Sequence, residues 1–155
     1  MSGWYSKITE DPTDLTPLVD CFAYFEGQLK EASIELNVGG RIELISKKLP
    51  GMAEYRFNQL QELEAILKFL NIRLDKKRAE RFRFYLEKYD RALSATEAKN
   101  FVDGDNEVLD LALLINQVAM LRNKYLGVTK GIEYLHFQIG NIIKLRTAGI
   151  EDASL

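Results

Sequence analysis

The feature that most constrains the fold is a run of apolar residues in the last third of the chain, spaced alternately by four and three positions. This spacing places the residues on one face of a helix, and so long a repeat is typical of helices packed along their length. It predicts one helix from about Asn106 to Thr147. The seam, meaning the line of residues expected to pack, comprises Leu114, Val118, Leu121, Tyr125, Val128, Ile132, Leu135, Ile139 and Ile142.

A second long helix is predicted from about Met52 to Leu93. No proline follows Pro50, so no residue of this kind interrupts the stretch. Its apolar positions again alternate in steps of three and four over most of the length. They are Leu60, Leu63, Leu67, Leu70 and Leu74, followed by Phe82, Tyr85, Tyr89 and Leu93.

Shorter signals punctuate the chain between these helices. Ser94 and Glu97 have the spacing of a capping box, which predicts the start of a short helical piece. Residues 102–105, with the sequence VDGD, predict a turn before the last helix.

The N-terminal third is less regular. We expect residues 1–13 to form a flexible arm and residues 14–155 to form a single helical domain. Asp14 is placed to cap a first helix, which continues to about Ile34.

Two breaks follow that first helix. Gly39 and Gly40 form a strong breaking pair, and Pro50 with Gly51 marks the next interruption. Between them, residues 41–48 are compatible with a helix or a strand, and their helical surroundings favour a helix.

The sequence therefore predicts an all-α chain of two long antiparallel helices with an N-terminal helical element. Each long helix would measure about 60 Å, too long for a compact ball whose radius of gyration would be about 15 Å. A hairpin of this kind leaves apolar side chains uncovered, which favours a ring-like homo-oligomer over a monomeric bundle closed by the first helix. The apolar residues off the two seams include Phe57, Ile66, Phe84, Leu113, Met120 and Phe137.

Enzymatic chemistry is not predicted. His136 is the only histidine, so one chain cannot build a histidine-based triad or histidine metal cluster. No phosphate-binding or dinucleotide motif occurs, and we expect neither a metal nor another cofactor. Cys21, the single cysteine, lies in an apolar stretch and is predicted to be a core thiol in a reducing compartment. No apolar run is long enough to predict a membrane span.

One segment departs from the average composition. Residues 73–91 carry eight cations and four anions, a net charge of +4 in a chain whose net charge is −2. Aromatic residues are interleaved with these cations, as in surfaces that bind single-stranded nucleic acid by phosphate contacts and base stacking. The predicted DNA-binding residues are Lys76, Lys77, Arg78, Arg81, Arg83, Phe84 and Tyr85. The alternative is a solvated helix face with Phe82, Tyr85 and Tyr89 buried in the seam.

Three stretches resemble the UvsY recombination mediators of T-even-type bacteriophages. They are residues 48–55 (KLPGMAEY), residues 78–85 (RAERFRFY), and the final helix with its FQI at 137–139 and KLRTAG at 144–149. The resemblance spans about residues 48–149. Arg81, Phe84 and Tyr85 match binding positions of the family, whereas its other basic position falls on Ala79, with Lys77 and Arg78 beside it.

The resemblance implies a mediator that binds single-stranded DNA, forms a ring-like helical oligomer and helps load a phage recombinase. Such a protein displaces the phage single-strand-binding protein in the cytoplasm of the infected bacterial host. Two other functions fit the same pattern. One is a structural or packaging ring of a virion, similar to a small terminase, and the other is a helical adaptor that does not meet nucleic acid.

Overall fold

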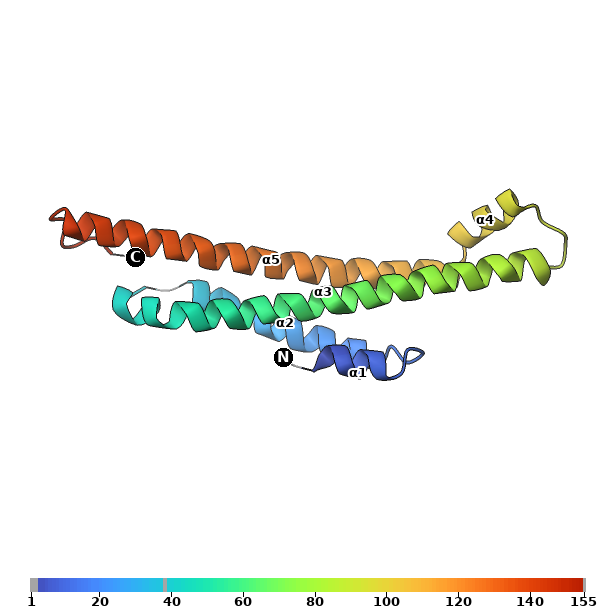
Figure 1. Cartoon of the computed structure of the whole chain (residues 1–155), viewed down its shortest axis with the longest axis horizontal. Helices are drawn as coiled ribbons and strands as arrows, with labels where there is room; N and C mark the ends of the chain where they lie inside the picture. Colours follow the sequence, from blue (N-terminus) through green and yellow to red (C-terminus); the bar gives the residue numbers. More distant parts are fainter. Residues whose placement is uncertain (1–2, 38, 155) are drawn as a thin grey trace. The chain divides into compact units, whose positions relative to one another are not determined.

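The computed structural model describes residues 3–37 and 39–154, and every regular element within these ranges is a helix (Figure 1). This confirms the predicted all-α class. The helices are α1 (Trp4–Glu10), α2 (Pro17–Leu36), α3 (Ile42–Glu87), α4 (Ala95–Asp103) and α5 (Asn106–Thr147). Within the described ranges, none of these helices has the length and apolar character needed to cross a membrane.

The chain divides into two compact units. Unit 1 contains the described residues up to Leu63 and those from Leu121 onward, and unit 2 is Glu64–Met120. Both long helices contribute to both units. α1 and α2 belong to unit 1, and α4 belongs to unit 2.

Helix α1 occupies most of the segment expected to be a flexible arm. Its Ile8 is fully buried, and the backbone N–H of Tyr5 donates to the buried Glu62 carboxylate over 3.1 Å. That bond satisfies one of the free N–H groups in the first turn of the helix. Trp4 and Ile8 have helical spacing, but a seven-residue helix is too short for a periodic pattern to reveal it.

Helix α2 begins at Pro17, three residues after the predicted cap at Asp14. The Asp14 carboxylate instead accepts hydrogen bonds from the backbone and the hydroxyl of Thr16, which lowers its pKa. Proline suits the first helical position because its missing N–H would have no partner there. The helix buries Leu18, Cys21, Phe25 and Ala32 on one face.

Helix α3 includes residues 42–48 and continues through Pro50, so the predicted interruption at Pro50 is wrong. Ile42 and Leu49 are buried in the core of unit 1, which holds the turns before the proline in place. Pro50 itself is exposed. The helix ends at Glu87, before the predicted end at Leu93, although Leu93 is still buried.

Helix α5 has the predicted bounds, and its seam packs within the chain. Eight of the nine seam residues are buried, from Val118 to Ile142. Leu114 is only half-buried, and its neighbours Leu111 and Ile115 are buried instead. The buried line therefore shifts by one position near the start of the helix, because an α-helix has 3.6 residues per turn and drifts against a strict repeat.

The core of unit 1 joins α2, α3 and α5. Its buried members are Ala32, Ile42, Leu49, Val128, Ile132, Leu135, Ile139 and Ile142. Gly131 lets α2 approach closely, since a Cβ there would lie 2.9 Å from the Leu36 Cδ1. Gly127, one turn earlier in α5, has open space around it.

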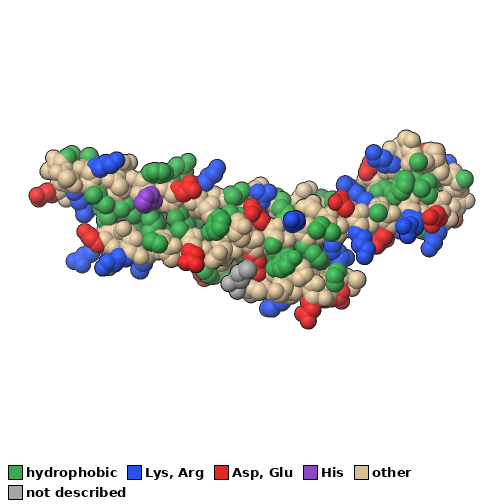
Figure 2. Space-filling model, viewed as in Figure 1, with side chains coloured by type: hydrophobic (Ala, Val, Ile, Leu, Met, Phe, Trp, Pro, Cys, Tyr) green, Lys and Arg blue, Asp and Glu red, His purple; other side chains and the backbone are tan. Residues whose placement is uncertain are grey.

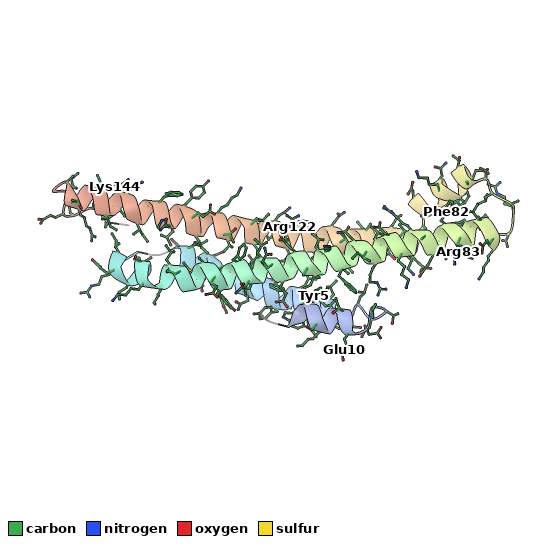
Figure 3. The ribbon with its side chains drawn as sticks, in the orientation of Figure 1. Tyr5, Glu10, Phe82, Arg83, Arg122 and Lys144 are labelled. Carbon is green, nitrogen blue, oxygen red and sulfur yellow. The ribbon has the colours of Figure 1, made fainter. Side chains whose placement is uncertain are left out.

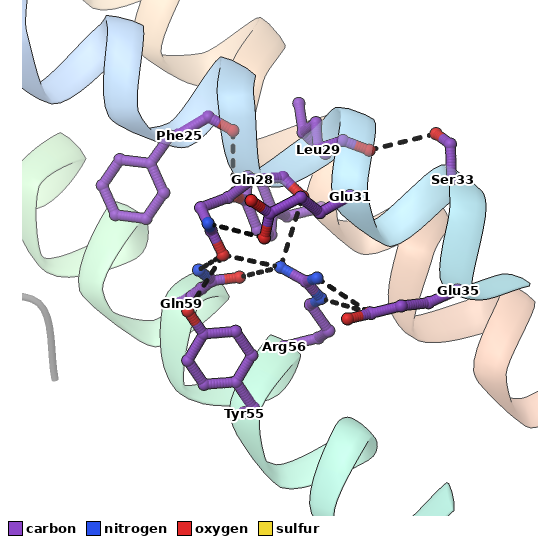
Figure 4. Close-up of polar contacts among 10 residues, drawn as sticks. Phe25, Gln28, Leu29, Glu31, Ser33, Glu35, Tyr55, Arg56 and Gln59 are labelled. Carbon is purple, nitrogen blue, oxygen red and sulfur yellow. Dashed lines mark hydrogen bonds and ion pairs between the residues drawn. The ribbon is translucent and has the colours of Figure 1, made fainter. Parts of the chain in front are cut away.

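A buried arginine links α2 to α3 in unit 1 (Figure 4). Arg56 is 0% exposed; its Nε donates to Glu35 Oε2 over 2.9 Å, and Nη1 reaches the Gln28 side chain at 3.0 Å. The Gln28 Oε1 also accepts from Gln59 Nε2 and from the hydroxyl of Tyr55. A buried charge is costly unless paired and hydrogen-bonded, so this network fixes the position of α2 on α3.

Candidate nucleic-acid interface

The basic segment lies in unit 2, on the last turns of α3 and in the loop after it. Figure 2 shows Lys and Arg side chains around an apolar area over α4 and the adjoining end of α3. Unit 2 is held together here by contacts among α3, α4 and the start of α5. These contacts decide which of the predicted residues are free to meet a ligand.

Asp105 gathers two of the predicted DNA-binding residues around one carboxylate. Arg81 Nε and the Tyr85 hydroxyl each donate to Asp105 Oδ2 over 2.7 Å. Its other oxygen accepts from the backbone N–H of Glu107 at 3.0 Å and Val108 at 3.4 Å. Asp105 is therefore the N-cap of α5 and also the anchor of α3 on that helix.

The charges in this cluster support one another. Burial acts to raise the pKa of Asp105, but the hydrogen bonds from Tyr85 and Arg81, with the charge of Arg81, outweigh burial and lower it. The hydrogen bond to Asp105 raises the pKa of Tyr85, the largest of the effects on that group. Asp105 thus stays ionised and Tyr85 neutral near pH 7.

Arg81, Tyr85 and Lys77 are consequently internal contacts of unit 2. Tyr85 is only 9% exposed and packs against Phe101 at 5.4 Å between ring centroids. Lys77 Nζ lies 3.0 Å from Glu107 Oε2. Their charges and the Tyr85 ring therefore already have partners from α4 and α5, whereas the sequence pattern predicts all three side chains as DNA contacts.

The remaining predicted cations are exposed. Lys76, Arg78 and Arg83 make no ion pair within the described parts of the chain. Phe84 is half-buried, and the guanidinium of Arg81 covers its ring at 4.4 Å from the centroid. The sequence pattern does not distinguish the paired cations from the unpaired ones, because the acidic partners of Lys77 and Arg81 come from a distant part of the chain.

Helix α4 adds a contribution that the sequence pattern did not identify. The predicted capping box is confirmed: the Ser94 side chain accepts from Glu97 N, and the Glu97 carboxylate accepts from Ser94 N. Ala98 and Val102 are buried, so α4 is firmly packed. Its Lys99 lines a notch between α3 and α4 together with Arg78 and Phe82. Figure 3 labels Phe82 on the side of α3 toward α4.

Cys21 and His136, the single cysteine and histidine of the sequence, lie in unit 1. Among the described residues, no group of three or more His, Cys, Asp or Glu side chains is placed to hold a metal ion. Cys21 is buried, and burial raises its pKa to about 12, in accord with a core thiol. His136 is exposed and lines an apolar groove with Pro50 and Phe137.

Comparison with known proteins returned no match to a protein-family model, to a curated protein or to a solved structure.

Proposed function

We propose that this protein binds single-stranded DNA through unit 2 and acts as a recombination mediator that helps load a phage recombinase. The observation that supports binding is the group of exposed, unpaired cations Lys76, Arg78 and Arg83 on α3. Each is available to replace a counterion on a phosphate. The mediator role, with its recombinase and single-strand-binding protein partners in an infected bacterial host, rests on the UvsY resemblance over residues 48–149.

The placement of these cations favours a single strand over a duplex. Lys76 and Arg83 are seven positions apart and share one face of α3, whereas Arg78 lies on another face beside the notch. A flexible single strand can follow cations around one helix. A duplex, with a persistence length of about 50 nm, cannot bend around a helix at this scale.

The experiment compares affinities for a single-stranded oligonucleotide and for a duplex of the same length and salt concentration. Tighter binding of the single strand supports the mediator proposal. Tighter binding of the duplex favours a packaging ring, and no binding to either leaves the helical adaptor.

We also propose that the two long helices run antiparallel and that copies of the chain associate in a ring. An antiparallel course is supported by Arg146 near the end of α5, which lies 4.0 Å from Glu43 near the start of α3. Lys77, in the later part of α3, forms an ion pair with Glu107, at the start of α5.

Self-association is supported by the apolar surface that each unit leaves open. In unit 1, Phe57 is 51% exposed and Phe137 is 65% exposed, and both line adjoining grooves between α3 and α5. In unit 2, Leu113 and Met120 are more than 60% exposed. Large apolar side chains gathered along grooves mark association surfaces more often than isolated ones do.

A further inference from the structure

The notch between α3 and α4 has the size and chemistry of a small-molecule site. It is an open hollow of about 350 Å³ lined by Arg78, Ala79, Phe82, Lys99, Val102 and Asp103. Binding pockets for small ligands begin at about 300 Å³. The lining is mostly apolar, and two cations from separate helices stand at its edge.

The apolar part of the notch suits an aromatic ring. Val102 is 5% exposed, Ala79 contributes only a methyl group, and Phe82 is half-buried. A half-buried ring still has surface for stacking. Phe84, by contrast, has the guanidinium of Arg81 over its ring.

The charged groups of the notch suit a phosphate beside Arg78 and Lys99 but not beside Asp103. Arg78 and Lys99 are exposed and make no ion pair among the described residues, so both can meet an anion. The carboxylate of Asp103 repels phosphate and, when ionised, only accepts hydrogen bonds. A ligand with a phosphate near the two cations and hydrogen-bond donors near Asp103 matches this arrangement.

The notch is also held in shape before any ligand arrives. The capping box at Ser94 and the burial of Ala98 and Val102 fix α4. Asp105 fixes the adjoining turns of α3 through Arg81 and Tyr85. A site that is already ordered loses little conformational freedom on binding.

We propose that this notch holds one nucleotide of a bound single strand, with its base on Phe82 and its phosphate between Arg78 and Lys99. This rests on the proposed function and adds to it a defined position for one base, to which α4 contributes. The base edge lies toward Asp103. A strand held in this way is gripped by its bases as well as by its backbone.

The test measures binding of a short oligonucleotide and of an abasic strand of equal length, which keeps the phosphates and lacks the bases. We expect Phe82→Leu to weaken binding of the normal strand by roughly tenfold, as stacking energies suggest, and to leave abasic binding unchanged. Lys99→Gln should weaken binding of both strands and flatten their salt dependence, since one phosphate contact is lost.

Two matched variants serve as controls. Tyr134→Leu removes an exposed aromatic ring of unit 1, and Lys30→Gln removes an exposed lysine of the same unit. Both should bind almost as the wild type does. Circular dichroism checks that each variant is folded. If Phe82→Leu does not fold, Lys99→Gln still tests the site.

The proposal is overturned if the wild type binds the normal and abasic strands equally well, or if Lys99→Gln behaves like Lys30→Gln. In either case the binding function itself stands, and only the nucleotide site is lost. If the wild type binds no single strand at all, the proposed function and this site both fall.

Discussion

At the scale of single residues, Asp105 joins α3 to the start of α5 within unit 2. It caps α5 and accepts hydrogen bonds from Arg81 and Tyr85 on α3. We expect Asp105→Asn to lower the free energy of unfolding near pH 7 by about 1–3 kcal/mol, because Arg81 loses the nearer of its two carboxylate partners. Asparagine is as good an N-cap as aspartate, so the helix start is preserved.

The pH dependence of that difference follows from the lowered pKa of Asp105. A carboxyl whose pKa is lower in the folded state stabilises the fold above its ordinary value of 3.8, and this contribution is lost as the pH falls through the folded value. The difference between wild type and Asp105→Asn should therefore shrink below about pH 4. Urea unfolding at a series of pH values measures this difference in the free energy of unfolding. If the difference stays constant into strong acid, the ionised carboxylate of Asp105 is not what stabilises the fold.

The partners of individual side chains could not be predicted from the sequence. The charge and aromatic pattern identified Arg81, Tyr85 and Lys77 as notable, but it assigned all three to an external ligand. Their partners, Asp105 and Glu107, lie at least twenty positions further along the chain. Periodicity describes one helix at a time and carries no information about which distant carboxylate a cation meets.

At the scale of elements, sequence patterns were informative where tertiary packing agreed with local preference. The bounds of α5 and the capping box of α4 were predicted because long periodic runs and caps are local signals. Pro50 was misread as an end, since the local rule omits the burial of Ile42 and Leu49 on the preceding turns. Helix α1 was missed because seven residues are too few for a periodic pattern, and because its contact with Glu62 comes from far along the chain.

Two glycines of α5 allow a matched test at this scale. Glycine in a helix interior costs about 1 kcal/mol relative to alanine. Gly127→Ala should raise the free energy of unfolding by about this amount, because nothing lies near its new methyl group. Gly131→Ala should raise it less or lower it, because the Leu36 side chain must move away from a 2.9 Å contact.

Thermal or urea unfolding of the two glycine variants, each compared with wild type, shows which variant is the more stable. A Gly131→Ala variant at least as stable as Gly127→Ala would mean that α2 does not approach α5 closely at Leu36.

At the scale of the whole molecule, the buried seam and the exposed apolar residues have separate roles. The seam of α5 from Val118 to Ile142 is buried within the chain, so it cannot also form an interface between copies. We therefore expect self-association to depend on exposed residues such as Phe57 and Phe137. Mass-resolved light scattering should give a species of more than two chains for the wild type, and a smaller one for Phe57→Ser with Phe137→Ser.

The control for that experiment replaces two exposed apolar residues of α2, Val19 and Ile34, by serine. Neither lines the grooves that contain Phe57 and Phe137. A wild-type mass equal to one 17.8 kDa chain at micromolar concentration would rule out the proposed oligomer.

The central claim is that the exposed cations of α3 bind the phosphates of a single strand, and its most direct test is a salt titration. Each phosphate contact on a single strand adds about 0.7 to the negative slope of log affinity against log salt. Changing Lys76, Arg78 and Arg83 together to alanine should weaken binding by at least about tenfold and flatten the slope by about 2. The control changes the exposed Lys30, Lys47 and Lys124 of unit 1, which alters net charge equally. We expect a near-normal affinity and slope for the control. If the two triple variants bind alike across the titration, the exposed cations of α3 do not form the phosphate-binding surface.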